Sequence, residues 1–258
     1  MQARWGTHGE HSIVALTAST HQDVFAMTVE AFNLAETYRT PVVLLLDEVV
    51  GHMREKVVIP EPGELALVER LKTSVPEGTD YHPYFPRDDG RLPMSDFGGY
   101  HRYNVTGLVH DMWGFPSNDP EVAHGLIQHL VTKIENHAAE ITRLQATDCE
   151  GAKTILISYG ASARSARHVA ASRRAHGERV GLIELQSLWP FPAAAVRRLC
   201  ADADTIPVVE MNMGQVSREV RRVLPNPERV FLANRYDREL VTPTDIRNIM
   251  RLVRGEGV

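Results

Sequence analysis

The residues of this chain whose types suit proton transfer or ligand binding gather at two places. His8 and His11 frame a His-Gly-Glu-His string near the start, and Asp47 ends an apolar run, with His52 and Arg54 shortly after it. Imidazoles near a reaction centre could donate or carry protons. Acids at the carboxyl end of a parallel strand lie where α/β folds bind ligands. We therefore predict that these five residues lie near an active site.

Each of these candidates also has a simpler interpretation. His8 and His11 could be ordinary loop histidines, because as metal ligands they lack a second cluster and the helical spacing of a zinc protease. Asp47 and the charges after it could form a salt-bridged structural turn. His110 and Asp111 could form a dyad, but adjacent residues rarely hold that geometry and no serine or cysteine nucleophile accompanies them. The sequence therefore predicts no metal site and identifies no catalytic residue.

Two further turns each join an apolar run to a helical pattern. Gly160-Ala161-Ser162 could bind phosphate at a helix N-terminus, but it lacks the spacing of a dinucleotide fingerprint, so a tight turn capped by Ser162 is favoured. Met211, Asn212 and Gln215 lie in a Glu-Met-Asn-Met-Gly-Gln string, where methionines would make adaptable contacts. We predict that this second turn contacts another subunit or the neighbouring domain. Ordinary core packing is the alternative.

The composition excludes several classes of protein. The chain has 258 residues, 43% hydrophobic and 24% charged, as in ordinary globular proteins. Its net charge of −5 argues against nucleic acid as the main partner, and arginines such as Arg164 and Arg167 fit solvated helix faces. Two cysteines cannot by themselves hold an iron–sulfur cluster or a structural zinc, and the low cysteine content fits a reducing cytoplasm. No apolar run is long enough to span a bilayer, and the first residues do not form a secretory signal.

The elements that must position these residues follow from the period of the apolar residues. A strand at 12–17, a helix at 22–38 and a strand at 42–46 form one βαβ unit. The apolar run of the second strand is typical of a central parallel strand covered on both faces. Residues 51–116 hold seven of the fifteen prolines and form an ordered connecting arm with a short helix at 63–73. A long helix is expected at 119–146.

The remainder alternates four times between strand and helix, which predicts a compact parallel-sheet domain. The expected strands are 154–159, 180–185, 206–210 and 229–233, and the expected helices are 161–176, 192–202, 214–223 and 243–254. We therefore divide this α/β chain into a partial domain at 1–60, an arm with the long helix at 61–150, and a second domain at 151–258.

Several longer strings resemble one family. They run from Gln2 to Gly9, Val29 to Glu36, Pro41 to Glu55, Tyr103 to Leu108, Trp189 to Pro192 and Val209 to Gln215. In these strings the chain resembles the α subunit of 2-oxoacid:ferredoxin oxidoreductases, most closely the 2-oxoglutarate type. The Gly-His-Met-Arg-Glu and Glu-Met-Asn-Met-Gly-Gln strings are the specific ones, whereas a βαβ pattern alone would be weak.

The resemblance implies both fold and chemistry. The first domain would be a remnant of the pyrimidine-binding domain of thiamine enzymes, and the last would resemble the C-terminal domain of transketolase. The family reaction is oxidative decarboxylation of a 2-oxoacid with coenzyme A, giving an acyl-CoA such as succinyl-CoA, carbon dioxide and reduced ferredoxin. Thiamine diphosphate, magnesium and a [4Fe-4S] cluster are implied for the complex and held mainly by the β or other subunits. We therefore expect the chain to need its β subunit and, alone, to hold none of these groups and be inactive.

The chain departs from the family at its front. Family α subunits carry a further N-terminal stretch with a Tyr-Pro-Ile-Thr-Pro motif and a substrate-binding arginine, and neither string occurs here. We therefore expect an N-terminally truncated α subunit. A non-catalytic assembly or docking subunit of such a complex, or another thiamine-dependent transketolase-like enzyme, are the alternatives.

Overall fold

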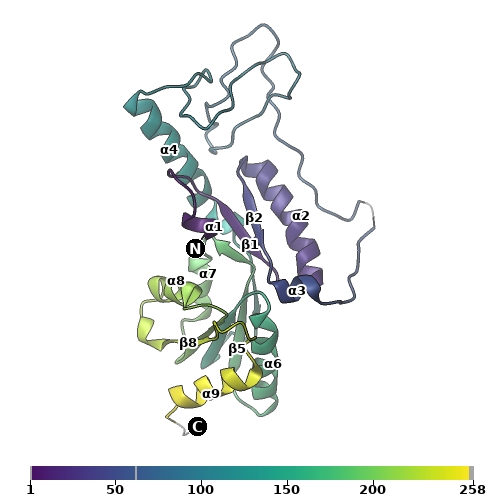
Figure 1. Ribbon diagram of the computed structural model, residues 1–258, viewed down its shortest axis with the longest axis vertical. Coiled ribbons are helices and arrows are strands. Elements are labelled where there is room, and N and C mark those ends of the chain that lie inside the picture. Colours follow the sequence, from purple (N-terminus) through teal and green to yellow (C-terminus); the bar gives the residue numbers. More distant parts are fainter. Residues whose placement is uncertain (1, 62, 256–258) are drawn as a thin grey trace.

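A computed structural model describes residues 2–61 and 63–255, arranged around two sheets that lie one above the other (Figure 1). The first sheet has the strand order β2-β1-β6. Strands β1 (Val14–Thr17) and β2 (Val42–Leu45) are parallel, and β6 (Ser187–Trp189) pairs antiparallel with β1. Helix α2 (His21–Tyr38) connects β1 to β2 as predicted, and it begins where the Thr20 hydroxyl accepts a hydrogen bond from the Asp23 amide.

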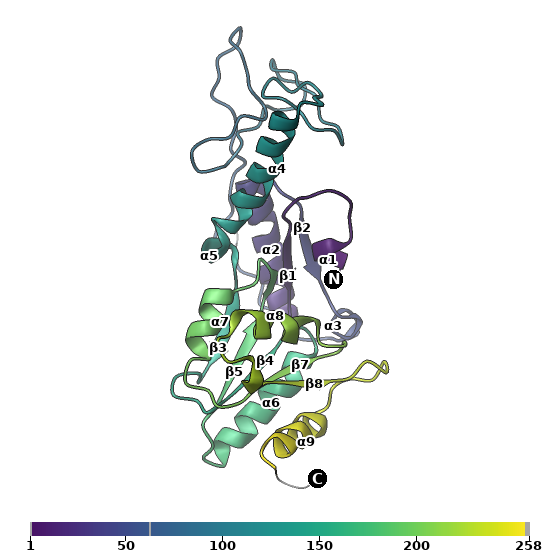
Figure 2. The ribbon, with the colours of Figure 1, turned by 90° about the vertical axis from the view of Figure 1, so that its left-hand side faces the viewer.

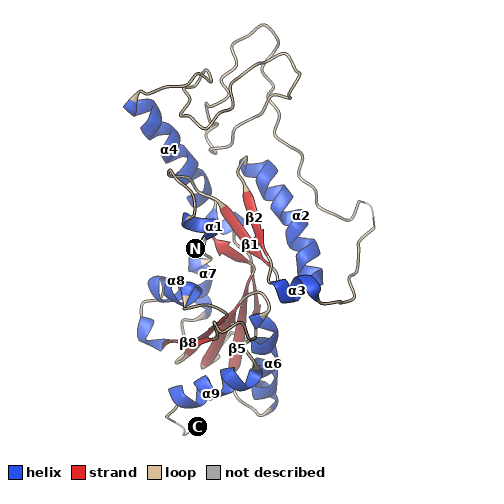
Figure 3. Cartoon of the chain, in the orientation of Figure 1, coloured by secondary structure: helices blue, strands red, loops and turns tan. Residues whose placement is uncertain are grey.

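The first sheet is covered by helices from two parts of the chain. Leu16 on β1 and Tyr38 on α2 belong to one buried cluster with Ile134 and Ile141. The last two lie on α4 (Pro120–Glu135) and α5 (Ala138–Ile141), so residues about a hundred positions apart in the sequence close one core. Figure 3 shows α2 and α4 flanking the strands. The short helices α1 (Gln2–Trp5) and α3 (Glu48–His52) were not predicted.

The second sheet has the order β3-β5-β4-β7-β8. Its strands are β3 (Leu144–Thr147), β4 (Thr154–Ser158), β5 (Val180–Leu185), β7 (Ile206–Glu210) and β8 (Val230–Asn234). The last four are parallel, as predicted, and β3 is an antiparallel edge. The chain is therefore an α/β protein with a mixed second sheet.

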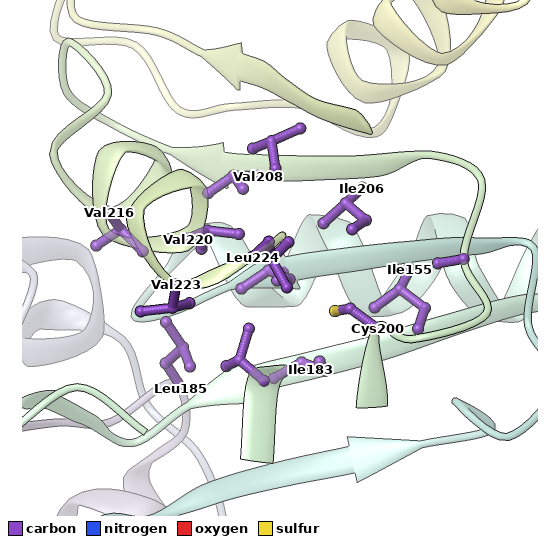
Figure 4. Close-up of a cluster of buried hydrophobic side chains, with 14 of the residues drawn as sticks. Ile155, Ile183, Leu185, Cys200, Ile206, Val208, Val216, Val220, Val223 and Leu224 are labelled. Carbon is purple, nitrogen blue, oxygen red and sulfur yellow. The ribbon is translucent and has the colours of Figure 1, made fainter. Parts of the chain in front are cut away.

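Helices cover both faces of this second sheet. Helices α7 (Ala193–Leu199) and α8 (Gln215–Val223) pack on one face, whose buried side chains are shown in Figure 4. Helices α6 (Ser162–Ala175) and α9 (Pro243–Val253) pack on the other, and a 3-10 turn at Pro227–Arg229 precedes β8. On β4, Ile155 and Ile157 face α7 and α8 while Leu156 faces α6 and α9, as the period of two requires.

The connecting arm rises from the first sheet to the end of the molecule farthest from α9 (Figure 2). The predicted helix at 63–73 is wrong, because this stretch is irregular, with a turn at Gly63 and an isolated bridge between Lys72 and Met94. Side chains of α2 hold its backbone instead: Gln22 hydrogen-bonds both the N–H and the carbonyl of Val58, and Asn33 bonds the Ala66 carbonyl and the Val68 amide. The two Asn33 bonds satisfy backbone groups within the stretch that was predicted to be helical.

The predicted helix at 119–146 is also wrong in its second half. Helix α4 ends at Glu135, where Asn136 caps it, and α5 adds a single turn. Residues 144–147 then pair with β5 through the register Leu144 to Leu185. Pairing with a fully buried strand overrides the helical spacing of these residues. The division of the chain at residues 60 and 150 stays a prediction.

Candidate functional site

A cavity of about 330 Å³ lies where the two sheets meet. The carboxyl ends of β1 and β2 contribute Thr17 and Asp47, and the end of β4 contributes Tyr159. Helix α1 and the start of α8 close the other sides, with an apolar lining of Ala15, Leu45, Leu46, Leu188 and Val216. A mostly apolar cavity of this size at the carboxyl ends of parallel strands has the features of a small-molecule site.

One wall of this cavity is a cluster of Arg4 with two indoles, whose rings are tilted by 46° to each other. The Arg4 guanidinium carbon lies 3.6 Å from the ring centroid of Trp189 and 4.4 Å from that of Trp5. The same guanidinium forms an ion pair with Glu219 on α8. The cation–π contact holds α1 against β6 of the first sheet, and the ion pair holds it against α8, which packs on the second sheet. The wall thus joins the first residues of the chain to elements about two hundred residues later.

Asp47 links the two sheets. Its Oδ2 accepts a hydrogen bond from the Ala161 amide at the start of α6, so the carboxylate satisfies a helix N-terminus on the second sheet. Gly160 has φ of +55°, and a Cβ there would lie 2.1 Å from that oxygen. The Gly160 turn therefore binds a carboxylate of this chain. The prediction that Ser162 caps the helix is wrong, because no side chain caps the start of α6.

A row of charged contacts continues beside Asp47. Glu55 accepts hydrogen bonds from the His21 amide and ring and pairs with Arg164, and these contacts lower the pKa of Glu55 to about 2. Next to it, Arg167 forms two hydrogen bonds to the buried Glu184, at 3.1 and 2.6 Å. Arg164 and Arg167 thus remain 36% and 41% exposed, as expected for a solvated helix face, and they also join α6 to acids.

The turn after β7 is built around a buried acid. Glu210 accepts hydrogen bonds of 2.9 Å from the amides of Val216 and Ser217, and burial raises its pKa. Asn212 donates to the Tyr159 hydroxyl at 2.7 Å and accepts from the amides of Gly214 and Gln215. Burial likewise raises the pKa of Tyr159, so its hydroxyl stays protonated at neutral pH.

The three turn residues predicted to make an interface are placed differently. Met211 is half-buried against the α6 and α9 core, Asn212 is engaged as above, and Gln215 lines the cavity. A second cavity of about 890 Å³, which also has Asp47 in its lining, lies between this turn and residues 235–240. It contains Met211, Asn212, Met213 and Gln215. The contact with another subunit stays a prediction.

Of the five residues predicted near an active site, only Asp47 lines the cavity. His8, His11, His52 and Arg54 are exposed, and none of these four lines it. Two of them make local polar contacts, Thr7 to His11 at 3.2 Å and Glu48 to His52 at 3.8 Å. The structure therefore does not gather the five residues at one point.

The His110–Asp111 pair forms no dyad. His110 stacks on Tyr84 with centroids 4.8 Å apart and hydrogen-bonds the Thr106 hydroxyl, while Asp111 accepts from the Trp113 and Phe115 amides. Both residues thus shape the arm, in agreement with the sequence analysis.

The residues that the sequence analysis missed are Arg4, Trp5, Tyr159, Trp189 and Glu219. Tryptophan is rare in this chain, with three in total, and two of them form the cavity wall. That rarity was the available signal, because indoles combine a large apolar surface with a hydrogen-bond donor. Nothing in the sequence indicates that positions 5 and 189 meet.

Among residues 2–61 and 63–255, no three His, Cys, Asp or Glu side chains are grouped so that they could hold a metal ion. In the same described part of the chain, no helix combines the length and apolar character needed to cross a bilayer.

Two protein-family models match the chain in succession. The model for pyruvate flavodoxin/ferredoxin oxidoreductase, thiamine diphosphate-binding, matches residues 1–127. The model for pyruvate:ferredoxin oxidoreductase core domain II matches residues 152–246. The first model covers the elements of the first sheet other than β6, and the second covers most of the second sheet.

Curated relatives match nearly the whole chain. It is 41% identical to 2-oxoglutarate synthase subunit KorA of Methanothermobacter thermautotrophicus over 97% of this chain and 66% of that protein. Identity to the KorA subunit of Methanocaldococcus jannaschii is 35%, over 95% of this chain and 65% of that protein. Ketoisovalerate oxidoreductase subunit VorB of M. thermautotrophicus is 29% identical over 97% of this chain and 63% of that protein. The chain thus spans just under two thirds of the length of these relatives.

A solved structure has the same fold. The 2-oxoglutarate:ferredoxin oxidoreductase from Magnetococcus marinus, with 2-oxoglutarate, coenzyme A and succinyl-CoA bound, superposes with a TM-score of 0.85 at 24% identity. The match covers 98% of this chain and 44% of that one. Both sheets and their relative placement therefore recur in a known protein.

Proposed function

The chain belongs to the 2-oxoacid:ferredoxin oxidoreductase family, and we propose that it works as part of the α subunit of a member specific for 2-oxoglutarate. The reaction is oxidative decarboxylation: the bond to the carboxyl carbon breaks, carbon dioxide leaves, the acyl group is transferred to the thiol of coenzyme A, and the electrons pass to ferredoxin. Thiamine diphosphate supplies the carbanion-stabilising chemistry when it is bound.

The observation that carries this proposal is the difference in identity between relatives of different substrate class. Over the same 97% of the chain, identity is 41% to a 2-oxoglutarate synthase subunit and 29% to a ketoisovalerate oxidoreductase subunit. The first relative therefore supports 2-oxoglutarate as the substrate and succinyl-CoA as the product.

The residues of this chain that line the cavity are suited to form one wall of the active site of the complex. The lining around Thr17, Leu45 and Trp189 offers apolar surface and an aromatic face, which can orient a planar ring and exclude water. The Oδ2 of Asp47 accepts a hydrogen bond from the amide at the start of α6, so Asp47 helps to position the two sheets. We propose that the diphosphate, its magnesium and the iron–sulfur cluster are held by the β or other subunits, which supply the ligands that the described residues lack.

The turn at Met211, Asn212 and Gln215 is our proposed contact with the β subunit. It borders the open cavity beside Asp47, and Met213 on the same turn is 65% exposed. Asn212→Ala removes bonds inside the turn, whereas Met213→Glu changes only its exposed side chain. Loss of co-purification with Met213→Glu supports the contact. Unchanged co-purification of both variants with the β subunit refutes it.

The test of the function is a reconstituted complex. The chain is co-expressed with the proposed β subunit, and reduction of ferredoxin is followed with coenzyme A and either 2-oxoglutarate, pyruvate or 3-methyl-2-oxobutanoate. We expect reduction with 2-oxoglutarate and at least tenfold less with the other two acids. A preference for another acid refutes the substrate assignment.

The same complex separates the enzyme from an assembly subunit. Trp189→Leu alters the cavity wall, and Phe32→Leu, on the exposed side of α2, is the matched control. If this chain forms part of the site, Trp189→Leu lowers the rate while Phe32→Leu does not. A stable complex with no activity, or one indifferent to both variants, favours a non-catalytic docking subunit.

A further inference from the structure

A polar cavity of about 480 Å³ lies between α4 and the turn at residues 87–90 of the connecting arm. We call it the α4 cavity. It shares no lining residue with the cavity between the two sheets, and Figure 2 shows the arm beside the upper end of α4. Its residues on α4 are three or four positions apart and form one face of the helix: Gly125, Gln128, His129, Thr132, Lys133 and Asn136. This face of α4 therefore offers several polar groups to a ligand.

Lys133 is the unusual member of this face, because it is a charged residue with only 3% of its surface exposed. Lysine is almost never this buried unless an acid pairs with it. Within residues 2–61 and 63–255, its ammonium donates one hydrogen bond, to the Arg39 carbonyl at 3.3 Å, and forms no ion pair with a carboxylate. The Arg39 guanidinium adds a second positive charge nearby. A buried charge without a partner is costly, so an anion in the cavity is favoured.

The acids around the α4 cavity do not neutralise Lys133. Glu140 on α5 pairs with Arg91 at 3.6 Å, and Asp89 on the turn pairs with the same guanidinium at 3.9 Å. Asp88 lines the cavity and is exposed to solvent. The positive charge of Lys133 is therefore left for a ligand to pair with.

Two further donors line the same cavity. The Nε2 atom of His129 is buried and has no hydrogen-bond partner in the described part of the chain. His129 lies four residues before Lys133, so the two side chains are neighbours on α4. Burial lowers the pKa of His129, so the ring is neutral at pH 7, and a neutral imidazole can donate from Nε2. Arg87 on the turn is exposed and forms no ion pair with a described acid.

We propose that the α4 cavity binds a small dicarboxylate, one end of which pairs with Lys133 and His129 and the other with Arg87. An ammonium and an imidazole N–H on successive turns of a helix can each donate to one oxygen of a carboxylate. Because Lys133 is buried and Arg87 is exposed, the first carboxylate lies inside the cavity and the second at its mouth. A cavity of this volume accommodates a chain of about four or five carbons. The bound molecule joins the connecting arm to α4, whatever the substrate of the complex is.

The experiment is calorimetric titration of the full chain with succinate and with acetate, at constant ionic strength in chloride. We expect succinate to bind at least about tenfold more tightly than acetate, because only succinate can also pair with Arg87. Arg87→Gln lowers the affinity for succinate to that for acetate, and Lys133→Met abolishes binding of both. Lys153→Met is the matched control, because it makes the same change at a half-exposed lysine outside the cavity. It leaves both affinities unchanged.

The pH dependence separates pairing with a carboxylate from a purely structural role of Lys133. The other charged or titratable groups that line the cavity or contact Lys133 in the described chain are Arg39, Arg87, Asp88, Asp89, His129 and His137. The pKa of Lys133 without ligand is about 8, so the charged fraction of its amine falls about tenfold between pH 7 and pH 9. We expect the affinity for succinate to fall by the same factor over this range.

Hydrogen exchange provides a measurement at the site itself. We expect succinate to slow exchange in peptides covering residues 86–91 and to leave α9 unchanged. The absence of saturable binding up to about 20 mM succinate overturns the proposal. Binding that Lys133→Met retains, equal affinity for the two acids, or an affinity that does not change between pH 7 and 9 also overturns it.

Discussion

Lys133 is a buried lysine, and the cost of burying its charge can be tested by a single substitution. It lies on α4 with 3% of its surface exposed, and its ammonium donates one hydrogen bond of 3.3 Å to the Arg39 carbonyl at the end of α2. No carboxylate forms an ion pair with it among the described residues. Burial, together with the nearby Arg39 guanidinium, lowers the pKa of Lys133 to about 8. The perturbation we propose is Lys133→Met, which keeps the length of the side chain and removes its charge.

The magnitude follows from the shift in pKa. The ordinary value is 10.5 and the folded value is about 8, a difference worth about 3 kcal/mol at about 1.4 kcal/mol per pH unit. Between pH 8 and 10.5 the unfolded chain binds more protons than the folded chain, so the wild type gains stability as the pH rises through this range. The cost of burying the charged Lys133 ammonium is therefore complete below pH 8 and is lost by about pH 10.5. Methionine also removes the bond to Arg39, worth about 1 kcal/mol. We therefore expect Lys133→Met to be more stable by about 2 kcal/mol at pH 7, and less stable by about 1 kcal/mol near pH 10.5.

The assay is urea unfolding of both proteins, followed by circular dichroism at several pH values between 7 and 10.5. Taking the difference between variant and wild type cancels the titration of all other groups. Lys153→Met is the control, because Lys153 is half-exposed, and its difference should stay within about 0.5 kcal/mol at every pH. A difference for Lys133→Met that does not change with pH would refute the argument from burial.

The remaining predictions concern the junction of the two sheets and the cofactor. Asp47→Asn should lower the free energy of unfolding by about 1 kcal/mol, because the α6 amide loses an anionic acceptor, and urea unfolding measures it. Gly160→Ala should destabilise more strongly, and Asp47→Ala should recover part of that loss because the oxygen 2.1 Å from the new Cβ is gone; strictly additive effects would count against the contact. The hydrogen bond from the His21 amide is the largest cause of the pKa of about 2 at Glu55, followed by the His21 ring and Arg164. The advantage of the wild type over Glu55→Gln should therefore be complete above about pH 4.5 and disappear as the pH falls towards 2, as thermal unfolding at pH 3 to 7 can check. Finally, calorimetric titration of the isolated chain with thiamine diphosphate and magnesium should show no micromolar binding, since the described residues hold no set of metal ligands.

The central strands of the second sheet were predictable because they are buried on both faces. Thr154–Ser158 and Val180–Leu185 are buried along their whole length, so their continuous apolar runs correspond directly to strands. The apolar run at Val42–Leu45 looks the same in the sequence, yet β2 is an edge strand whose last residue, Leu45, is exposed. The pattern of apolar residues predicts that a segment is a strand, but it does not predict which strands lie next to it in the sheet.

The site was less predictable because long-range pairs create it. Trp189 reaches the cavity through pairing of β6 with β1, where Ala15 opposes Trp189 across more than 170 residues of sequence. Asp47 was identified from its position after a strand, but its partner, the Ala161 amide, is a backbone group that any sequence carries. His52 and Arg54 were candidates because of their residue types. The fold leaves both side chains exposed and outside the lining of the cavity, which the sequence does not indicate.

The exchange of strands between the sheets has a consequence for how this gene could be divided. Strand β6 lies within the second half of the sequence and completes the first sheet, while β3 precedes residue 151 and forms the edge of the second. A cut between residues 150 and 151 would leave each fragment holding one strand that belongs to the other. Neither fragment would then be well folded alone, because each lacks a strand that the other carries. Such a pair would be suited to a complementation reporter, in which association of the fragments completes both sheets.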